Sequence, residues 1–419
     1  MELESRIKYV HGPEEVTYGP EELVVVCLMR DGRPYLKSFI EHYFSLGVKH
    51  IFFLDNGSTD GTVSVARSYE NVTVLQTDLP FKEYKNPLRR YLVTRFGRGR
   101  WVLYVDIDEL FDYAYSDVVS LESLLRYLTE RSYTAVVGQM LDMFPEEPLM
   151  RAGRGEGKDE PLKELHRFYD VSNIRTEDYR AFRESDNTVA SEEIGVYRDG
   201  IHKTVFDQRA LLTKHPLMFI DDEIRPMDPA VHWVGGARVA DVTCVLFHYK
   251  FLGDFYERTL RAVREESHAN DSAKYKRFLE TLERDSEPRI KRETAQELGD
   301  VNDLVGNQFL IASGDYMALV DEEERKGASG LEPSEPGRLL EAFSRASARA
   351  SAQARAVRRL ERKVGKLEDN LARERRKARL RERKTKNLER QIQDMQGSRT
   401  WRLLDKLGRI RARLSGKGK

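Results

Sequence analysis

Four apolar segments in the first quarter of the chain constrain the fold more than any other feature. They span residues 23–29, 50–54, 72–75 and 101–105. Continuous apolar, β-branched runs of this length are typical of parallel strands that are buried on both faces. Apolar residues at helical spacing follow the first run, and a capping segment follows the second. The sequence therefore predicts an α/β fold with a doubly wound sheet, whose ligands bind at the carboxyl ends of the strands.

An Asp-x-Asp pair, Asp106 and Asp108, follows the fourth apolar segment. Side chains two residues apart in a strand point to the same face, so both carboxylates can point at one place. Two oxygen ligands without a nearby cysteine suit Mg²⁺ or Mn²⁺, which keep positions open for phosphate oxygens. Alternatively, the pair simply ends a strand in solvent. Asp31 and Asp55 end two other predicted strands, and this convergence favours a site.

Length and composition set the broad class of the protein. A chain of 419 residues with 40% hydrophobic content can bury a large core, and no apolar run approaches the roughly 18 residues of a membrane span. The N-terminus is acidic and polar, unlike a signal peptide. Cys27 and Cys244 lie in apolar strand-like runs, and we expect buried thiols in a reducing compartment.

The net charge of zero conceals an asymmetry between the two ends of the chain. Residues 339–419 hold 26 Lys and Arg against 9 Asp and Glu, which leaves 44 basic and 61 acidic residues in positions 1–338. The chain is thus an acidic body with a basic tail, and the Gly-, Pro- and Ser-containing stretch 327–338 is predicted to link them.

Three motifs in the first half resemble family 2 glycosyltransferases of the GT-A fold. They are Arg30-Asp31 after the first strand, Asp-Asn-Gly-Ser-Thr-Asp-Gly-Thr at 55–62, and Asp-Ile-Asp-Glu at 106–109. Segments 198–206, 214–217 and 246–251, with His232, resemble the bacterial branch of this family. The resemblance covers roughly residues 22–290. In one departure, Gly32 follows Arg30-Asp31 where the family more often has Arg-Asn-Glu, which weakens the expectation of base or ribose contacts there.

The resemblance implies transfer of a sugar from a nucleotide-diphosphate sugar, with UDP-sugars favoured, by an inverting enzyme of hexosyltransferase type. It implies a Mn²⁺ or Mg²⁺ ion held by Asp108 and Asp106, which would neutralise the leaving diphosphate. His248 is the candidate third ligand, because it ends an apolar run; the alternative is a satisfied core histidine. His202 and His232 are weaker candidates on the same argument, and Lys203 could face the diphosphate.

The nucleotide would be bound by residues at the ends of the first strands. By analogy Asp55 accepts a hydrogen bond from the base, or else serves the turn that follows it. Arg30 and Asp31 would lie beside the nucleotide. Arg89 or Arg90 could pair with phosphates, since arginine suits bidentate phosphate contacts, or could form an exposed helix face.

Inverting transfer also needs a general base that takes the proton of the acceptor hydroxyl. We expect a carboxylate or histidine from the segment after the Asp-x-Asp strand. Asp170 is the nominee, and Asp186 and Glu192 follow it closely. Each of them could equally be an ordinary surface acid.

The resulting division of the chain has several parts. An N-terminal extension (1–21) precedes a GT-A domain (22–326), which consists of a nucleotide-binding half (22–112), an acceptor half (113–290) and a helical extension (291–326). The linker (327–338), a coiled coil (339–396) and a basic amphipathic tail (397–419) follow.

The tail suggests how the protein is placed in the cell. Heptad spacing from Val357 predicts a coiled coil that forms homo-oligomers, or else a single charged helix. Trp401, Leu404, Leu407, Ile410 and Leu414 form an apolar stripe beside a basic face, as in helices that bind anionic membrane surfaces. Nucleic acid is not expected as a partner, because the tail has one aromatic residue and no recognisable nucleic-acid fold.

The predicted function is a cytoplasmic enzyme at the inner face of a bacterial plasma membrane that acts on a cell-envelope or capsular glycan. A non-catalytic scaffold that assembles partners through its coiled coil is the alternative. A nucleotidyltransferase would share the α/β body, but no Gly-rich phosphate loop lies near the N-terminus.

Overall fold

The structure, a computed structural model, describes residues 3–149, 162–181, 186–227, 232–264, 273–285 and 287–329, and positions 403, 406, 407, 409 and 410. The chain forms two compact units, Met1–Ser344 and Arg345–Lys419. The predicted coiled coil (339–396) lies outside the described residues, as does most of the tail (397–419). Of the apolar stripe, Leu407 and Ile410 are described; both are helical and exposed.

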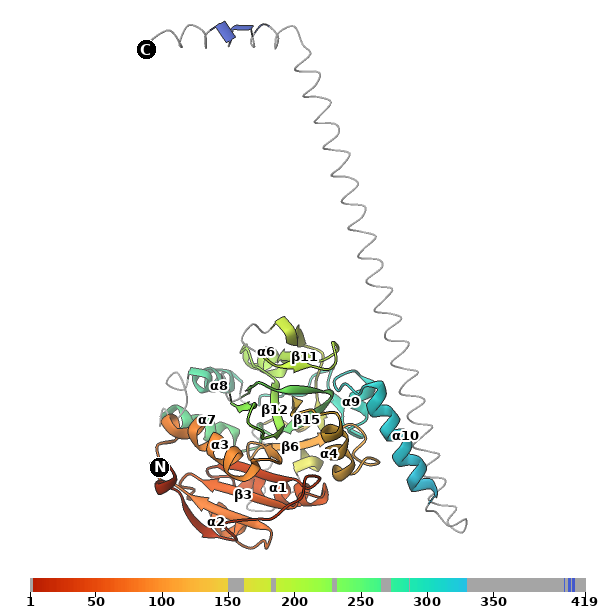
Figure 1. Cartoon of the computed structure of the whole chain (residues 1–419). Helices are drawn as coiled ribbons and strands as arrows, with labels where there is room; N and C mark the ends of the chain where they lie inside the picture. The colour runs from red at the N-terminus through yellow and green to blue at the C-terminus, as the bar shows by residue number, and fades with distance from the viewer. Residues whose placement is uncertain are drawn as a thin grey trace, which may run out of the picture. The chain divides into compact units, whose positions relative to one another are not determined.

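The first unit is built on a large mixed sheet, which has ten strands among the described residues (Figure 1). In spatial order the strands are β1 (Lys8–His11), β4 (Val72–Gln76), β3 (His50–Asp55), β2 (Val24–Met29), β5 (Trp101–Tyr104), β12 (Thr213–Phe219), β7 (Ala135–Asp142), β15 (Arg238–His248) and β10 (Thr188–Val189), and β6 (Glu109–Tyr113) pairs with β15. Two-stranded pairs join β9 (Ile174–Asp178) to β11 (Gly195–Asp199), β13 (Arg225–Pro226) to β14 (Val234–Gly235), and β8 (Phe168–Tyr169) to β16 (Gln296–Glu297).

The described helices are α1 (Arg33–Ser45), α2 (Thr62–Ala66), α3 (Phe81–Gly97), α4 (Leu121–Glu130), α5 (Leu162–Leu165), α6 (Gly200–Phe206), α7 (Phe255–Arg264), α8 (Ala273–Arg284), α9 (Asp303–Gly306) and α10 (Gly314–Ser329), with short 3₁₀ turns at Glu4–Arg6 and Tyr179–Ala181. Helix α10 continues into the first residues of the predicted linker. Within the described ranges, no helix combines the length and apolarity that crossing a bilayer requires.

The apolar segments form parallel, two-sided strands as predicted. Every residue of β2 and β3 is buried, and β2 pairs in parallel with β3 on one side and β5 on the other. Met29 is opposite Asp55, so the loops after β2 and β3 emerge at the same edge of the sheet. Cys27 and Cys244 are buried free thiols.

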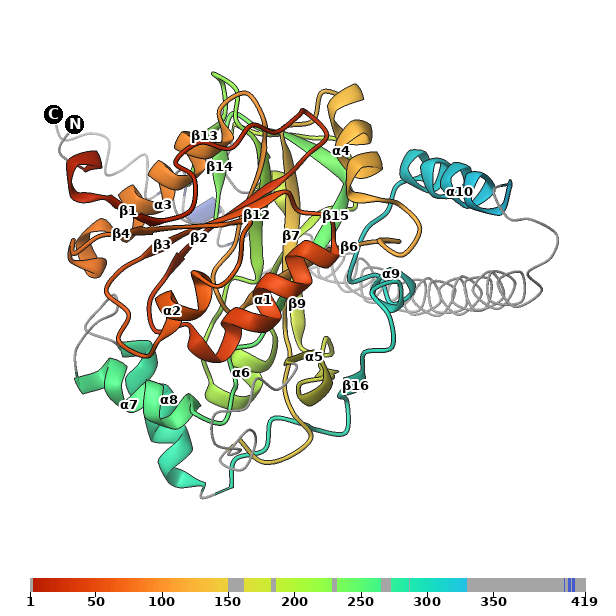
Figure 2. The ribbon, with the colours of Figure 1, turned by 90° about the horizontal axis from the view of Figure 1, so that it is seen from below.

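Helices cover both faces of this parallel part of the sheet. Figure 2 shows α1 and α2 on one face and α3 on the other. The alternation of side chains along β2 explains this arrangement: Val25 and Cys27 pack in the cluster that contains α1, and Val24 and Val26 in the cluster that contains α3. Gly47 (φ +90°) ends α1 in the left-handed conformation that glycine adopts without strain.

The fold class is confirmed: a central mixed sheet flanked by helices, as in the GT-A fold. One local expectation was wrong. Strand β5 ends at Tyr104, so Asp106 and Asp108 lie in a turn, where the Glu109 N–H donates to the Asp106 carbonyl at 3.0 Å. The two aspartates are therefore not related by strand alternation.

Candidate functional site

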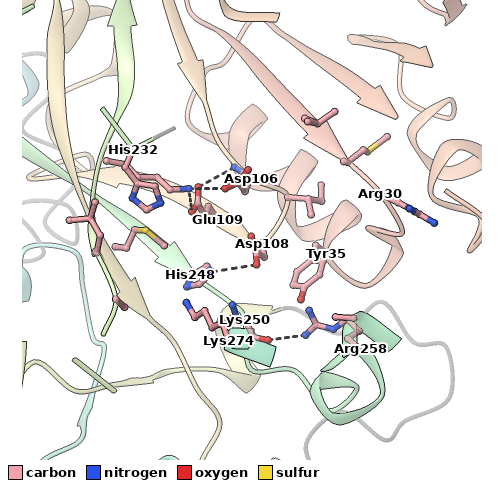
Figure 3. A pocket seen from close by; sticks show the side chains of 18 of the residues that line it. Arg30, Tyr35, Asp106, Asp108, Glu109, His232, His248, Lys250, Arg258 and Lys274 are labelled. Carbon is pink, nitrogen blue, oxygen red and sulfur yellow. Dashed lines mark hydrogen bonds and ion pairs between the residues drawn. The ribbon is translucent and has the colours of Figure 1, made fainter. Parts of the chain in front are cut away.

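A cavity of about 550 Å³ opens at the carboxyl edge of β2 and β5 (Figure 3). Residues from β12 and β15 and from helices α1, α3, α6, α7 and α8 also line it. The predicted site residues that it brings together are Arg30, Asp31, Arg89, Asp106, Asp108, His202, His232 and His248. The cavity thus lies at the edge of the sheet where the strand pattern predicted a site.

The charged lining of this cavity is mainly cationic. Among the described residues it includes eight Lys or Arg side chains and four carboxylates. The cations are Arg30, Arg89, Arg209, Lys214, Lys250, Arg258, Arg261 and Lys274. Such a surplus of positive charge in a concave site favours an anionic ligand.

Asp106 is held by protein cations. Its carboxylate accepts hydrogen bonds from Arg89 at 3.0 Å, Lys214 at 2.7 Å and the Tyr104 hydroxyl at 2.6 Å. Burial alone would raise the pKa of Asp106, but Lys214 and Arg89 hold it well below its usual value. Direct ligation of a metal by Asp106 would therefore require one of these cations to move.

Asp108 has a histidine partner instead. Its Oδ2 lies 3.4 Å from Nε2 of His248, at the end of β15, and Figure 3 shows the two side chains pointing toward each other. With Glu109 they form a group whose potential ligand atoms lie within 4.8 Å of one another. A carboxylate and an imidazole at this spacing suit a divalent cation.

Of the residues predicted to bind the nucleotide, some line the cavity and some do not. Arg30 is exposed at the cavity, and Asp31 (φ +50°) accepts a hydrogen bond from the Thr59 N–H at 2.8 Å. Asp55 is fully buried and outside the lining. Its carboxylate accepts from the N–H groups of Gly57 and Ser58 and from the Gln76 amide, which is the turn role given as its alternative.

The nominated general bases lie outside the described lining of the cavity. The carboxylate of Asp170 accepts hydrogen bonds from the Ser172 N–H at 2.8 Å and the Thr294 hydroxyl at 2.6 Å. Asp186 pairs with Arg225, and Glu192 with Arg180. The alternative phosphate ligand Arg90 is also outside; it donates to the carbonyls of Pro226 and Met227.

Sequence reasoning missed several cations of the site. Lys250, Arg258 and Lys274 line the cavity, and Figure 3 shows Lys250 and Lys274 beside His248 and Arg258 near Tyr35. Arg258 donates to the Lys250 carbonyl at 2.8 Å. Desolvation and the neighbouring Lys250 lower the pKa of Lys274 to about 7. In the sequence, the position of Lys250 two residues after His248 was the one indication of this role. Helices α7 and α8, which carry Arg258 and Lys274, contain no recognisable motif.

Comparison with known proteins adds one informative match. Residues 23–190 match the family described as Glycosyl transferase family 2. No curated protein matches the chain. Among solved structures, UDP-glucose pyrophosphorylase complexed with UDP-glucose is similar at 7% identity, with 61% of this chain and 86% of that chain covered; its TM-score of 0.21 is too low to support an argument. The family match supports a family 2 glycosyltransferase in this chain, and with it glycosyltransferase activity in general terms.

Proposed function

We propose that the protein transfers a sugar from a nucleotide-diphosphate sugar, with UDP-sugars favoured, to a glycan of the bacterial cell envelope or capsule, with inversion. The observation that carries this proposal is the cationic cavity at the carboxyl edge of the strands, with Asp108 and His248 inside it. A diphosphate is the part of such a donor that a cationic site would recognise.

Asp108 and His248 fit a divalent cation, because an oxygen and a nitrogen donor face each other across 3.4 Å. A bound Mn²⁺ or Mg²⁺ ion would supply Lewis-acid stabilisation of the leaving diphosphate. In this proposal Asp106 keeps Arg89 and Lys214 in place as fixed positive charges beneath the donor.

Lys250, Arg258 and Lys274 add positive charge to the cavity lining beyond that of Arg89 and Lys214. They would contact the phosphates and orient the donor, so that the bond to be broken faces the acceptor. Arg258 is held for this by its hydrogen bonds to Asp254 and to the Lys250 carbonyl.

The acceptor base is a separate part of the proposal. Asp170 is outside the described cavity lining, so it could serve only if its segment moves toward the acceptor. Loss of transfer in Asp170→Asn with retained donor binding would support that role, and normal transfer would remove it.

Calorimetric titration of UDP, GDP and dTDP into the full chain, with Mn²⁺ and with a chelator, tests the donor site. We expect metal-dependent binding of one nucleotide that weakens about 100-fold or more in Asp108→Asn. Asp112→Asn is the matched control: it lies on β6 next to this turn but outside the cavity lining, and should bind normally.

One observation favours the scaffold alternative. Arg89 and Lys214 neutralise the Asp106 carboxylate, which leaves it less negative charge to attract a metal ion. If the folded chain binds none of the three nucleotides while it forms stable oligomers, the scaffold function would replace the enzymatic one.

A further inference from the structure

Four side chains contact one another in series, starting at Asp108. His248 lies between Asp108 and Asp142, and His202 lies on the far side of Asp142. They come from the turn after β5, from β15, from β7 and from α6. His248, Asp142 and His202 are each at most 7% exposed. Pattern analysis of the sequence did not single out Asp142.

The register of the sheet fixes the positions of His248 and Asp142, the two central members of this series. Parallel pairing of β15 with β7 places His248 opposite Asp142, and antiparallel pairing of β15 with β6 places it opposite Glu109. The Met143 N–H donates to the His248 carbonyl at 3.0 Å, and the Tyr249 N–H to the Asp108 carbonyl at 2.8 Å. The backbone therefore holds His248 between two acidic segments.

The two ring nitrogens of His248 lie at different distances from their neighbouring carboxylates. Nδ1 lies 2.6 Å from Oδ1 of Asp142, which is a short charge-assisted hydrogen bond. Nε2 lies 3.4 Å from Oδ2 of Asp108. Two ligands of one ion, each about 2.1 Å from it, stand roughly 3.0–3.5 Å apart. The ion therefore fits on the Nε2 side, and Asp142 is too close to Nδ1 to share an ion with it.

His202 supports Asp142 from behind. Its Nε2 lies 3.4 Å from Oδ2 of Asp142, and its ring packs beside Phe251 and Phe278. The Asp142 carboxylate thus has an imidazole at each oxygen, and it cannot rotate without losing one of them.

We infer that Asp142 is a positioning residue, which fixes the His248 ring through Nδ1 so that Nε2 points to a metal ion shared with Asp108, and that His202 holds Asp142 in this orientation. The inference rests on the metal site in the proposed function. A carboxylate that accepts the second N–H of a metal-bound imidazole selects its tautomer and raises its basicity. It would contribute to metal affinity without touching the metal.

Mn²⁺ binding to the full chain, followed by electron paramagnetic resonance of the free ion, tests this inference. Asp142→Asn should weaken Mn²⁺ binding about 10- to 100-fold. Asp241→Asn is the matched control. Asp241 is a buried acid on β15, the strand that carries His248; it is bonded to Tyr127 and Ser313 and lies outside the cavity lining, so its substitution should leave the Mn²⁺ affinity unchanged.

A measurement on the unmodified protein covers the case in which Asp142→Asn does not fold. Nitrogen-15 NMR of the histidine rings in the Zn²⁺-loaded protein, with His248 assigned by its absence in His248→Gln, should show a proton on Nδ1 and the metal on Nε2. Metal on Nδ1 would place the ion among Asp142, His202 and His248 and overturn the inference.

The outcomes separate this inference from the proposed function. Unchanged Mn²⁺ affinity in folded Asp142→Asn, with normal nucleotide binding, overturns the positioning role alone. Absence of nucleotide binding by the unmodified chain overturns the proposed function, whatever the metal result. Absence of Mn²⁺ binding with intact nucleotide binding overturns the metal site and the inference together.

Discussion

Lys214 Nζ lies between two carboxylates, 2.7 Å from Asp106 and 2.5 Å from Glu109. Lys214 and Glu109 are almost completely buried. Although burial lowers the pKa of a lysine, Asp106 and Glu109 outweigh it and raise the pKa of Lys214 above its usual value. The ammonium is therefore a permanent charge beneath the cavity, and it joins β12 to the turn that carries Asp108.

Substitution of Lys214 by methionine should destabilise the protein by about 3–5 kcal/mol, because it leaves the buried Glu109 carboxylate without its cation and leaves the half-buried Asp106 with Arg89 alone. Urea unfolding at neutral pH measures the change. Lys203→Met is the matched control: Lys203 is half-exposed and pairs with Asp207 at the surface, so the expected change is within about 0.5 kcal/mol. Equal stability of the two variants would contradict the structural role of Lys214.

Lys250→Met should weaken UDP binding about 10-fold or more but leave uridine binding unchanged. The reason is that a hydrogen bond to a charged group contributes about 1.5–3 kcal/mol, and Lys250 would contact the phosphates alone. Competition binding with both ligands measures the difference. Arg264→Met, in α7 but outside the cavity lining, should bind both normally. A parallel loss of uridine affinity would show that Lys250 acts on the whole pocket.

His50 should make the protein less stable in acid. Burial lowers its pKa from 6.5 to about 4, and its Nε2 is 2.9 Å from the Thr73 hydroxyl. Because the unfolded chain binds the proton more tightly, this contribution is complete above pH 6.5 and is lost as the pH falls toward 4. At about 1.4 kcal/mol per pH unit, the loss by pH 5 is roughly 2 kcal/mol.

Urea unfolding at pH 7.5 and pH 5 measures this effect. In His50→Gln, which keeps a donor for Thr73, the difference in stability between the two pH values should be smaller by that amount. Other buried histidines contribute to the acid dependence in both proteins, so the comparison between them isolates His50. If the loss of stability between pH 7.5 and pH 5 is the same in both proteins, His50 is not a source of the acid dependence.

Deletion of residues 397–419 should release the protein from anionic vesicles, since Leu407 and Ile410 are exposed beside many basic residues. Sedimentation with phosphatidylglycerol vesicles, compared with neutral vesicles, measures binding. Replacement of Leu407 and Ile410 by serine, which keeps the charge, should weaken binding as well. Unchanged binding after the deletion would remove the proposed membrane attachment at the inner face of the plasma membrane.

The local pattern of apolar residues was sufficient to predict the parallel half of the sheet. Strands β2 to β5 are continuous apolar runs, and a run buried on both faces has few other structures available. The loops after β2 and β3 follow from the same pattern, because parallel strands end at one edge. The motif spacing and the resemblance also indicate Asp108 and His248 as candidate site residues.

Tertiary structure alone decided how the charges of the site are paired. Lys214 meets Asp106 across 108 residues of chain, and Asp142 meets His248 across 106. Both pairs depend on the strand order β5, β12, β7, β15, in which strands from distant segments become neighbours. No local periodicity encodes that order. The sequence by itself determined which residues can carry charge at the carboxyl edge, and the pairing of the strands decided which of those charges face one another.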